Sequence, residues 1–196
     1  MKTIENPEPG RRTFIKLVSV AGVGSMVFPF KAWASGTSRN SRIVSVTDDL
    51  ATNGLNIDKD VVQTMMDSGI MELAQIWDVG SAWKSLFPDI TADKTIAIKV
   101  NCASPGLPSH PIVTEAIANS LTKMPFGGSF FPENNIIIFE RTDYELINAG
   151  FTINASSSGV RCFGTNHSGV GFSSQTYPVN GQNKKISRIV SDMADY

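Results

Sequence analysis

Two apolar stretches decide the fold of this chain: KTIAIKV at residues 94–100 and NIIIFE at residues 135–140. Each is short, rich in β-branched side chains and bounded by loop residues, which is typical of a buried β-strand. Between them, residues 111–123 predict a helix that opens with Pro111, whose missing N–H would be unpaired there anyway. The order strand, helix, strand predicts a parallel sheet with right-handed crossovers.

A second helix is predicted directly after the second strand. Thr142 and Glu145 have the spacing of a capping box. Gly150 stands where a helix commonly ends. Apolar runs at residues 151–153 and 160–163 predict two further short strands. The fold class is therefore α/β, with a parallel or mixed sheet and flanking helices.

The residues before the first strand predict more helix. Apolar positions recur at helical spacing over residues 59–86, and we expect Gly69 and Gly80 to interrupt this stretch and give two helices. Residues 43–46 form a short apolar run that predicts a strand. A single α/β domain over residues 43–196 fits this length of chain.

The first 34 residues have the pattern of an export signal. A polar segment that contains Arg11 and Arg12 leads into an uncharged run at residues 17–30, and a small-x-small cleavage site ends at Ala34. The sequence RRTFIK resembles the twin-arginine motif. The apolar run is shorter than the roughly 20 residues that span a bilayer. A general secretory signal or an uncleaved anchor is the alternative.

This signal predicts where the protein is found and which machinery carries it. We expect the twin-arginine translocase as a partner during export, and a periplasmic or extracellular location afterwards. Residues 35–42 then form a Gly/Ser/Asn-rich linker before the domain, and no stable membrane span remains after cleavage. Because the twin-arginine route carries folded proteins, many of which bind a cofactor, a bound cofactor is a reasonable expectation.

Charge and cysteine content narrow the function classes. Residues 1–34 hold five of the 17 Lys and Arg and two of the 18 Asp and Glu, so the remaining chain has a net charge of −4. A nucleic-acid interface needs a basic face, so this balance argues against one. Cys102 and Cys162 form no CxxC pair, and the usual zinc and iron–sulfur spacings are absent.

Polar residues at the predicted strand ends form the candidate site. In parallel α/β sheets the ligand crevice lies beyond the carboxyl ends of the strands. Both strands end in polar residues, and the helix after the first strand begins beside a histidine, so all of these face one rim. The candidate ligand or metal residues are Lys99, Asn101, Cys102, His110, Glu140 and Arg141.

The charged candidates each have a functional and a structural interpretation. Lys99 sits late in a buried strand, where a lysine is costly unless it is paired or faces a crevice. It is an anion contact, a Schiff-base or ligand lysine, or an ion-pair partner of Glu140. Glu140 and Arg141 together bind a polar substrate, or a metal through Glu140, or form a structural pair.

The remaining candidates also have both functional and structural interpretations. Cys102 is a metal ligand, a nucleophile, a disulfide partner of Cys162 or a small core residue. His110 is a ligand or acid–base group, or the cap of the helix that follows. Asn101 orients a ligand or caps its loop. His167 lies in a Gly/Ser-rich loop with no partner in view, so we expect a solvated loop residue.

Several segments resemble one known family. IAIKVNC, then SHP opening a helix, then NIIIFERTDYELINAGFTIN and SGVRCFGT are similar to the family numbered 362 of the domains of unknown function, in its branch with twin-arginine signals. The resemblance covers about residues 43–190 and implies an α/β fold without an established reaction. Some relatives carry ferredoxin-like iron–sulfur modules, and this sequence contains no such module. The cofactor is unknown, and a metal or an iron–sulfur cluster stays open.

The resemblance also bears on completeness and on function. Family members are about twice as long and continue with a further strand, so we expect this chain to correspond to the amino-terminal half of an incomplete domain. Three functions remain: an exported metal- or cofactor-binding enzyme or redox-associated protein, a non-catalytic periplasmic binding or accessory protein, and a non-functional fragment. The substrate is unknown.

Overall fold

The computed structural model describes residues 42–104 and 106–196 of the 196-residue chain. The predicted export signal, its Arg11–Arg12 pair and the cleavage site at Ala34 lie outside the described residues. Residues 42–196 form one compact unit. Within the described residues, no helix is long and apolar enough to cross a bilayer.

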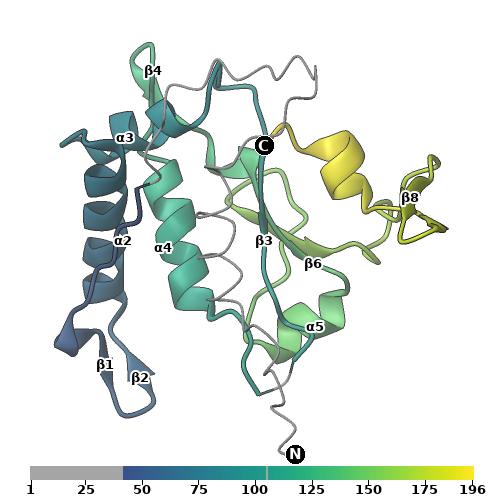
Figure 1. Cartoon of the computed structure of the whole chain (residues 1–196), viewed down its shortest axis with the longest axis horizontal. Helices are drawn as coiled ribbons and strands as arrows, with labels where there is room; N and C mark the ends of the chain where they lie inside the picture. Colours follow the sequence, from purple (N-terminus) through teal and green to yellow (C-terminus); the bar gives the residue numbers. More distant parts are fainter. Residues whose placement is uncertain (1–41, 105) are drawn as a thin grey trace, which may run out of the picture. The chain divides into compact units, whose positions relative to one another are not determined.

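A three-stranded parallel sheet lies at the centre of this unit and confirms the predicted α/β fold (Figure 1). Its strands are β3 (Ile96–Lys99), β6 (Ile136–Glu140) and β7 (Arg161–Gly164), in the order β3-β6-β7. The central strand, β6, is the most apolar of the three, and all five of its residues are buried. A parallel strand covered on both faces is expected to read as a continuous apolar run, as this one does.

Two crossover helices cover one face of the sheet. Helix α4 (Pro111–Leu121) joins β3 to β6, and α5 (Asp143–Asn148) joins β6 to β7. Because side chains alternate along a strand, Ile136 and Ile138 of β6 point to this face, where they pack with residues of α4 and α5. Leu146 of α5 is completely buried there.

The carboxyl-terminal segment covers the opposite face. Ile137 and Phe139 of β6 pack there with Phe163 of β7 and with Val170 and Ile189. Ile189 begins a short π-helix, Ile189–Met193, in a region where the sequence shows no clear pattern. The core of the unit is thus one sheet with apolar contacts on both sides.

Two further helices pack beside α4. They are α2 (Lys59–Ala74) and α3 (Val79–Leu86), so the predicted pair of helices is confirmed. The predicted position of the break is wrong. Gly69 lies inside α2 and Gly80 inside α3, and the chain instead leaves α2 at Gln75, whose φ of 56° is left-handed.

Two other local expectations differ from the structure. Residues 43–46 form no strand, and Ile43 is almost fully exposed. Residues 151–153 also form no strand, although the next residue, Asn154, makes an isolated bridge to Cys162. Both segments are apolar, but a strand also requires a neighbour with free backbone groups, and local sequence does not report that neighbour.

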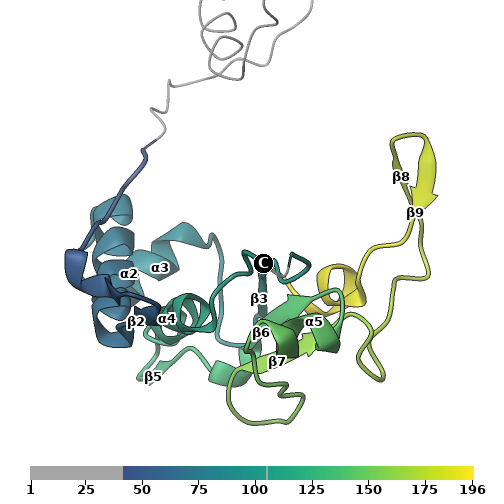
Figure 2. The ribbon, with the colours of Figure 1, turned by 90° about the horizontal axis from the view of Figure 1, so that it is seen from below.

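Three short antiparallel hairpins lie outside the main sheet. They pair β1 (Thr52–Asn53) with β2 (Asn56–Ile57), β4 (Pro125–Phe126) with β5 (Ser129–Phe130), and β8 (Tyr177–Val179) with β9 (Gln182–Lys184). Figures 1 and 2 both show the β8–β9 hairpin away from the three-stranded sheet. None of them supplies a residue to the candidate site described below.

The last residues lie along the free edge of β3. The backbone N–H of Ala97 donates to the carbonyl of Tyr196 at 2.8 Å, and the N–H of Tyr196 donates to Thr95 at 3.2 Å. The Tyr196 ring packs edge-on against Phe87, with ring centroids 5.3 Å apart. These contacts reduce the exposure of backbone groups that an edge strand otherwise leaves unpaired.

Gly80 allows α3 to approach the end of α4 closely, and this gives a first prediction. A Cβ at this position would lie 1.9 Å from the carbonyl oxygen of Lys123. Overpacking costs roughly 1–3 kcal/mol even when side chains can adjust, and here the obstacle is backbone. We expect Gly80→Ala to lower the free energy of unfolding by about 2 kcal/mol in urea titrations, despite the higher helix propensity of alanine.

Gly106→Ala is the matched control for this substitution. Nothing lies within 4 Å of a Cβ at Gly106, and its φ is not positive. We expect its free energy of unfolding to stay within about 0.5 kcal/mol of the parent value, as for most unencumbered surface positions. Equal stabilities of the two variants would contradict the close α3–α4 approach.

Candidate functional site

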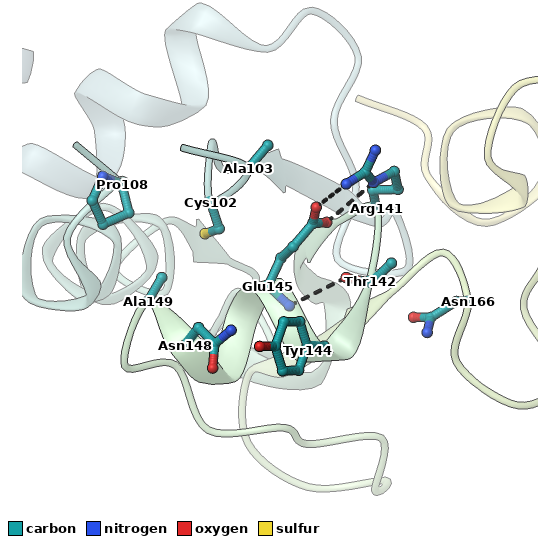
Figure 3. A pocket seen from close by; sticks show the side chains of 10 residues that line it. All are labelled: Cys102, Ala103, Pro108, Arg141, Thr142, Tyr144, Glu145, Asn148, Ala149 and Asn166. Carbon is teal, nitrogen blue, oxygen red and sulfur yellow. Dashed lines mark hydrogen bonds and ion pairs between the residues drawn. The ribbon is translucent and has the colours of Figure 1, made fainter. Parts of the chain in front are cut away.

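A cavity of about 460 Å³ lies at the carboxyl ends of the strands, where α/β sheets commonly bind ligands. It is formed by the loop after β3, the start of α5 and the loop after β7 (Figure 3). We refer to it as the rim pocket. Its lining residues are Cys102, Ala103, Pro108, Arg141, Thr142, Tyr144, Glu145, Asn148, Ala149 and Asn166.

Glu140, the last residue of β6, organises the floor of this rim. The residue is 4% exposed, and its carboxylate accepts three hydrogen bonds. One comes from Lys99 Nζ at 2.8 Å, one from the backbone N–H of Cys102 at 2.9 Å, and one from the backbone N–H of Arg141 at 2.7 Å. A single side chain therefore connects the ends of β3 and β6.

These contacts explain the protonation state of Glu140. Burial raises the pKa of its carboxyl group, but the bonds from Lys99, Cys102 and Arg141 favour the ionised form and leave the pKa below its ordinary value. Lys99 Nζ also donates to the carbonyl of Val100 at 2.5 Å. The structure thus places Lys99 in an ion pair with Glu140, which is the structural interpretation of both residues.

The Arg141 side chain lines the rim pocket and does not pair with the carboxylate of Glu140. Its guanidinium pairs with Glu145 one helical turn away, and Figure 3 shows Glu145 reaching from α5 towards it. The Arg141 side chain is 69% exposed, whereas that of Glu145 is 11% exposed. Thr142 Oγ accepts from the backbone N–H of Glu145 at 3.2 Å, which is one of the two hydrogen bonds of the predicted capping box. The Glu145 carboxylate, which would make the other bond, is paired with Arg141 instead.

The two cysteines are free and buried. Burial and the nearby Glu140 charge raise the pKa of the Cys102 thiol. Burial likewise raises the pKa of Cys162 to about 12. The thiolate is the reactive form, so neither cysteine is activated as a nucleophile. Both belong to the cluster around Leu146, which is the small-core-residue interpretation of Cys102.

His110 and Asn101 stabilise the loop after β3. The Nδ1 atom of His110 accepts from the backbone N–H of Ile112 at 3.2 Å and so caps α4. The backbone N–H of Asn101 donates to Ser109 Oγ at 3.0 Å, and the backbone N–H of Ser109 donates to the carbonyl of Asn101 at 2.8 Å. Asn101 is exposed to solvent. These two candidates therefore serve as cap and loop closure, and neither lines the rim pocket.

The predicted residues do not assemble into a metal centre. In the part of the chain that the structure describes, no three His, Cys, Asp or Glu side chains lie close enough together to hold a metal ion. Glu140 already has three donors, and the imidazole of His110 caps a helix. The candidates that remain available to a ligand are Arg141 and the edge of Cys102 that borders the pocket.

The expectation for His167 is wrong. Its Nδ1 atom lies 2.7 Å from the Asp143 carboxylate, and its side chain is only 26% exposed. The two residues are 24 positions apart and meet because β6 and β7 are adjacent parallel strands. The sequence signal was limited to one fact: each residue follows the end of a predicted strand.

Comparisons with protein-family models, with curated proteins and with solved structures gave no match to this chain.

Glu140 gives a second prediction, on pH dependence. We expect Glu140→Gln to lower the free energy of unfolding at pH 7 by about 2 kcal/mol, because charge-assisted hydrogen bonds to a buried carboxylate are lost. The Lys99 side chain is half exposed, so solvent screens its part of this stabilisation. A lowered folded pKa stabilises the protein above the unfolded value near 4.5, and this contribution is lost as pH falls through the folded pKa. The difference between parent and variant should therefore shrink below pH 4.5.

Glu115→Gln serves as the control in the same urea titrations. Glu115 is exposed on α4. We expect its substitution to change the free energy of unfolding by less than about 0.5 kcal/mol at both pH 7 and pH 3. A Glu140→Gln penalty that stays constant between pH 7 and pH 3 would contradict the ionised state of Glu140.

Proposed function

We propose that this protein is exported and binds a small solute with a single carboxylate in the rim pocket. The observation that carries the proposal is the Arg141 guanidinium, which is mostly exposed and lines a cavity of about 460 Å³ at the carboxyl ends of a parallel sheet. Cavities of roughly 300–1,000 Å³ are typical of small-molecule sites. This function corresponds to the binding-protein alternative from the sequence.

Arg141 has donors left for a ligand. A guanidinium carries five N–H donors in a planar fork that matches a carboxylate. Glu145 accepts from Nε and from one Nη of Arg141 and so holds the fork in place. Ordering of this kind lowers the entropy that binding would otherwise cost. The remaining N–H groups are available at the exposed side of the pair.

The other lining residues favour a small, partly apolar molecule. Tyr144, Asn148 and Asn166 offer a hydroxyl and two amides, and Figure 3 labels all three around the pocket. Ala103 and Pro108 supply an apolar wall on the side of the β3 loop. A few placed polar groups within an apolar lining are what fixes ligand orientation in such sites.

Charge balance narrows the ligand class. The pocket holds one cation, Arg141, and one anion, Glu145. A molecule with several negative charges would meet the Glu145 carboxylate without a second cation to offset it. A monocarboxylate, or an amino acid whose ammonium faces Glu145, meets complementary charges. We therefore propose these two groups of solutes as the ligands.

The route of export and the family are part of the same proposal. The support for both is in the sequence: the Arg11–Arg12 motif and AWA cleavage site for twin-arginine export, and the ordered segments from IAIKVNC to SGVRCFGT for family 362 of the domains of unknown function. A solute-binding protein outside the cytoplasm is consistent with both. An exported enzyme that uses a metal has less support, because the described residues offer no three-ligand cluster.

A binding experiment tests the proposed ligand class. Purified protein is titrated calorimetrically with acetate, lactate and a set of L-amino acids, and the same solutes are screened by thermal melting. We expect at least one to bind, and Arg141→Gln to weaken that binding about tenfold or more, equivalent to roughly 1.4 kcal/mol. Failure of every carboxylate to bind would contradict the proposal.

Arg188→Gln is the matched control for Arg141→Gln. Arg188 forms the same type of exposed i,i+4 ion pair, with Asp192 at 2.8 Å, but lies outside the rim pocket. We expect its substitution to leave the dissociation constant within about twofold. Equal loss of binding in both variants would indicate a general electrostatic effect rather than a site at Arg141.

A second experiment tests export. Replacing Arg11 and Arg12 by lysine keeps the charge of the segment but removes the twin-arginine motif. We expect mature protein of the mass that begins at Ser35 to disappear from the extracytoplasmic fraction, while precursor accumulates inside the cell. Unchanged export of the Lys-Lys variant would indicate the general secretory route instead.

A further inference from the structure

The lining of the rim pocket is divided into a charged side and an apolar side. Figure 3 shows Arg141 and Glu145 on one side of the pocket, Pro108 and Ala149 on the other, and Cys102 between them. The last three carry no charge. A ligand that is held at Arg141 therefore has apolar surface next to it in one direction.

The apolar side consists of small side chains from two elements. Cys102, Ala103 and Pro108 belong to the loop after β3, and Ala149 follows α5. Burial raises the pKa of the Cys102 thiol, so this side chain is neutral and behaves as a small apolar group. Ala103 is exposed and Pro108 is partly buried. A hydrocarbon chain can contact this surface without displacing water from a charged group.

Large exposed apolar side chains are concentrated on the same two elements. Tyr144 lines the pocket and is 72% exposed. Leu107, directly before Pro108, is 83% exposed, and Ile147, in α5, is 58% exposed. Exposed apolar surface of this kind beside a cavity is typical of a ligand-binding groove. It is a second observation, independent of the pocket lining, that favours a ligand with an apolar part.

The Glu145 carboxylate is already engaged by Arg141. Its two oxygens accept from Nε, at 3.4 Å, and from Nη2 of the guanidinium, and its side chain is 11% exposed. Little of this carboxylate is left for a second cation. An amino acid held through its carboxylate at Arg141 would also bring its α-ammonium close to the guanidinium, which has the same charge. The geometry therefore favours a carboxylate without an α-ammonium.

We propose that the ligand of the rim pocket is an aliphatic monocarboxylic acid whose carboxylate binds Arg141 and whose hydrocarbon chain lies along the apolar side. This inference rests on the proposed carboxylate site, and it selects the monocarboxylates from the two groups of solutes proposed there. Arg141 then recognises the head of the ligand, and Ala103, Pro108 and Ala149 select for its chain.

Chain length is the first test, by calorimetric titration of the purified protein with acetate, butanoate and hexanoate. A fully buried methylene is worth about fourfold in affinity, and roughly twofold is expected in an open pocket. We expect hexanoate to bind about tenfold or more tighter than acetate, and 1-hexanol, which lacks the carboxylate, to bind at least about tenfold more weakly than hexanoate.

The outcomes of this titration separate the two proposals. If acetate and hexanoate bind with equal affinity, the contact with the hydrocarbon chain is overturned and the carboxylate site stands. If 1-hexanol binds as tightly as hexanoate, the role of the carboxylate is overturned. If none of the three carboxylates binds, the carboxylate site itself falls, and this inference falls with it.

The α-ammonium is tested by one matched pair of ligands. 4-Methylpentanoate and L-leucine share the carboxylate and the branched chain and differ only in the α-ammonium. We expect 4-methylpentanoate to bind about tenfold or more tighter, because its α-carbon brings no cation towards Arg141. Equal or tighter binding of leucine would overturn the choice of monocarboxylates, again without affecting the carboxylate site.

Two neighbouring substitutions test the apolar side. Ala103→Asn places an amide on it, and we expect hexanoate binding to weaken about fivefold while acetate binding stays within about twofold. Ser104→Asn is the matched control, because Ser104 is the next residue, is exposed and does not line the pocket. We expect it to change neither affinity by more than about twofold.

Arg141→Gln completes the set of variants. It removes the contact with the head of the ligand and not with the chain, so we expect acetate and hexanoate binding to weaken by the same factor. Circular dichroism confirms that each variant is folded. Unchanged hexanoate binding in Ala103→Asn, or equal weakening in Ala103→Asn and Ser104→Asn, would overturn the assignment of the hydrocarbon chain to this side of the pocket.

Discussion

The carboxylate of Glu140 is the interaction on which the rim of this protein depends. It lies at the end of the central strand, almost without exposure, and is satisfied by one ammonium and two backbone N–H groups. An ionised group at this depth is tolerated only when it is paired and fully hydrogen-bonded. Since the donors come from the ends of β3 and β6, the requirement also sets the relative position of two of the segments that line the rim pocket, the loop after β3 and the turn from β6 into α5.

Several rim residues consequently serve structure rather than ligand binding. Lys99 neutralises Glu140, and His110 caps α4. Two further side-chain pairs lie at the same strand ends. Arg141 is paired with Glu145 and is largely exposed, and His167 is paired with Asp143. The contacts of Glu140 with Lys99, Cys102 and Arg141 fix the backbone at the ends of β3 and β6, close to both pairs. Side chains that are already ordered in this way would lose little conformational entropy on binding a ligand.

Two side-chain pairs lie on the outer part of this rim. Arg141 and Glu145 present balanced charge to a cavity, which suits a small carboxylate or a zwitterion. Asp143 and His167 form the second pair, with 2.7 Å between His167 Nδ1 and Asp143 Oδ2. They are joined through Asn166, which borders the cavity and binds the backbone of Asp143. Both pairs therefore lie at the same edge of the sheet.

The sequence by itself determined that strands lie within residues 94–100 and 135–140, that helices lie between and after them, and hence the parallel sheet and the rim at its carboxyl end. These features are local, since periodicity and helix caps are set by residues a few positions apart. The tertiary structure alone decided how the rim residues pair. Lys99 and Glu140 are 41 positions apart and Asp143 and His167 are 24 apart, so only the adjacency of β3, β6 and β7 brings them together. For the same reason the loop that contains His167 did not predict Asp143 as its partner, because hydrogen-bond partners across a sheet leave no trace in local sequence.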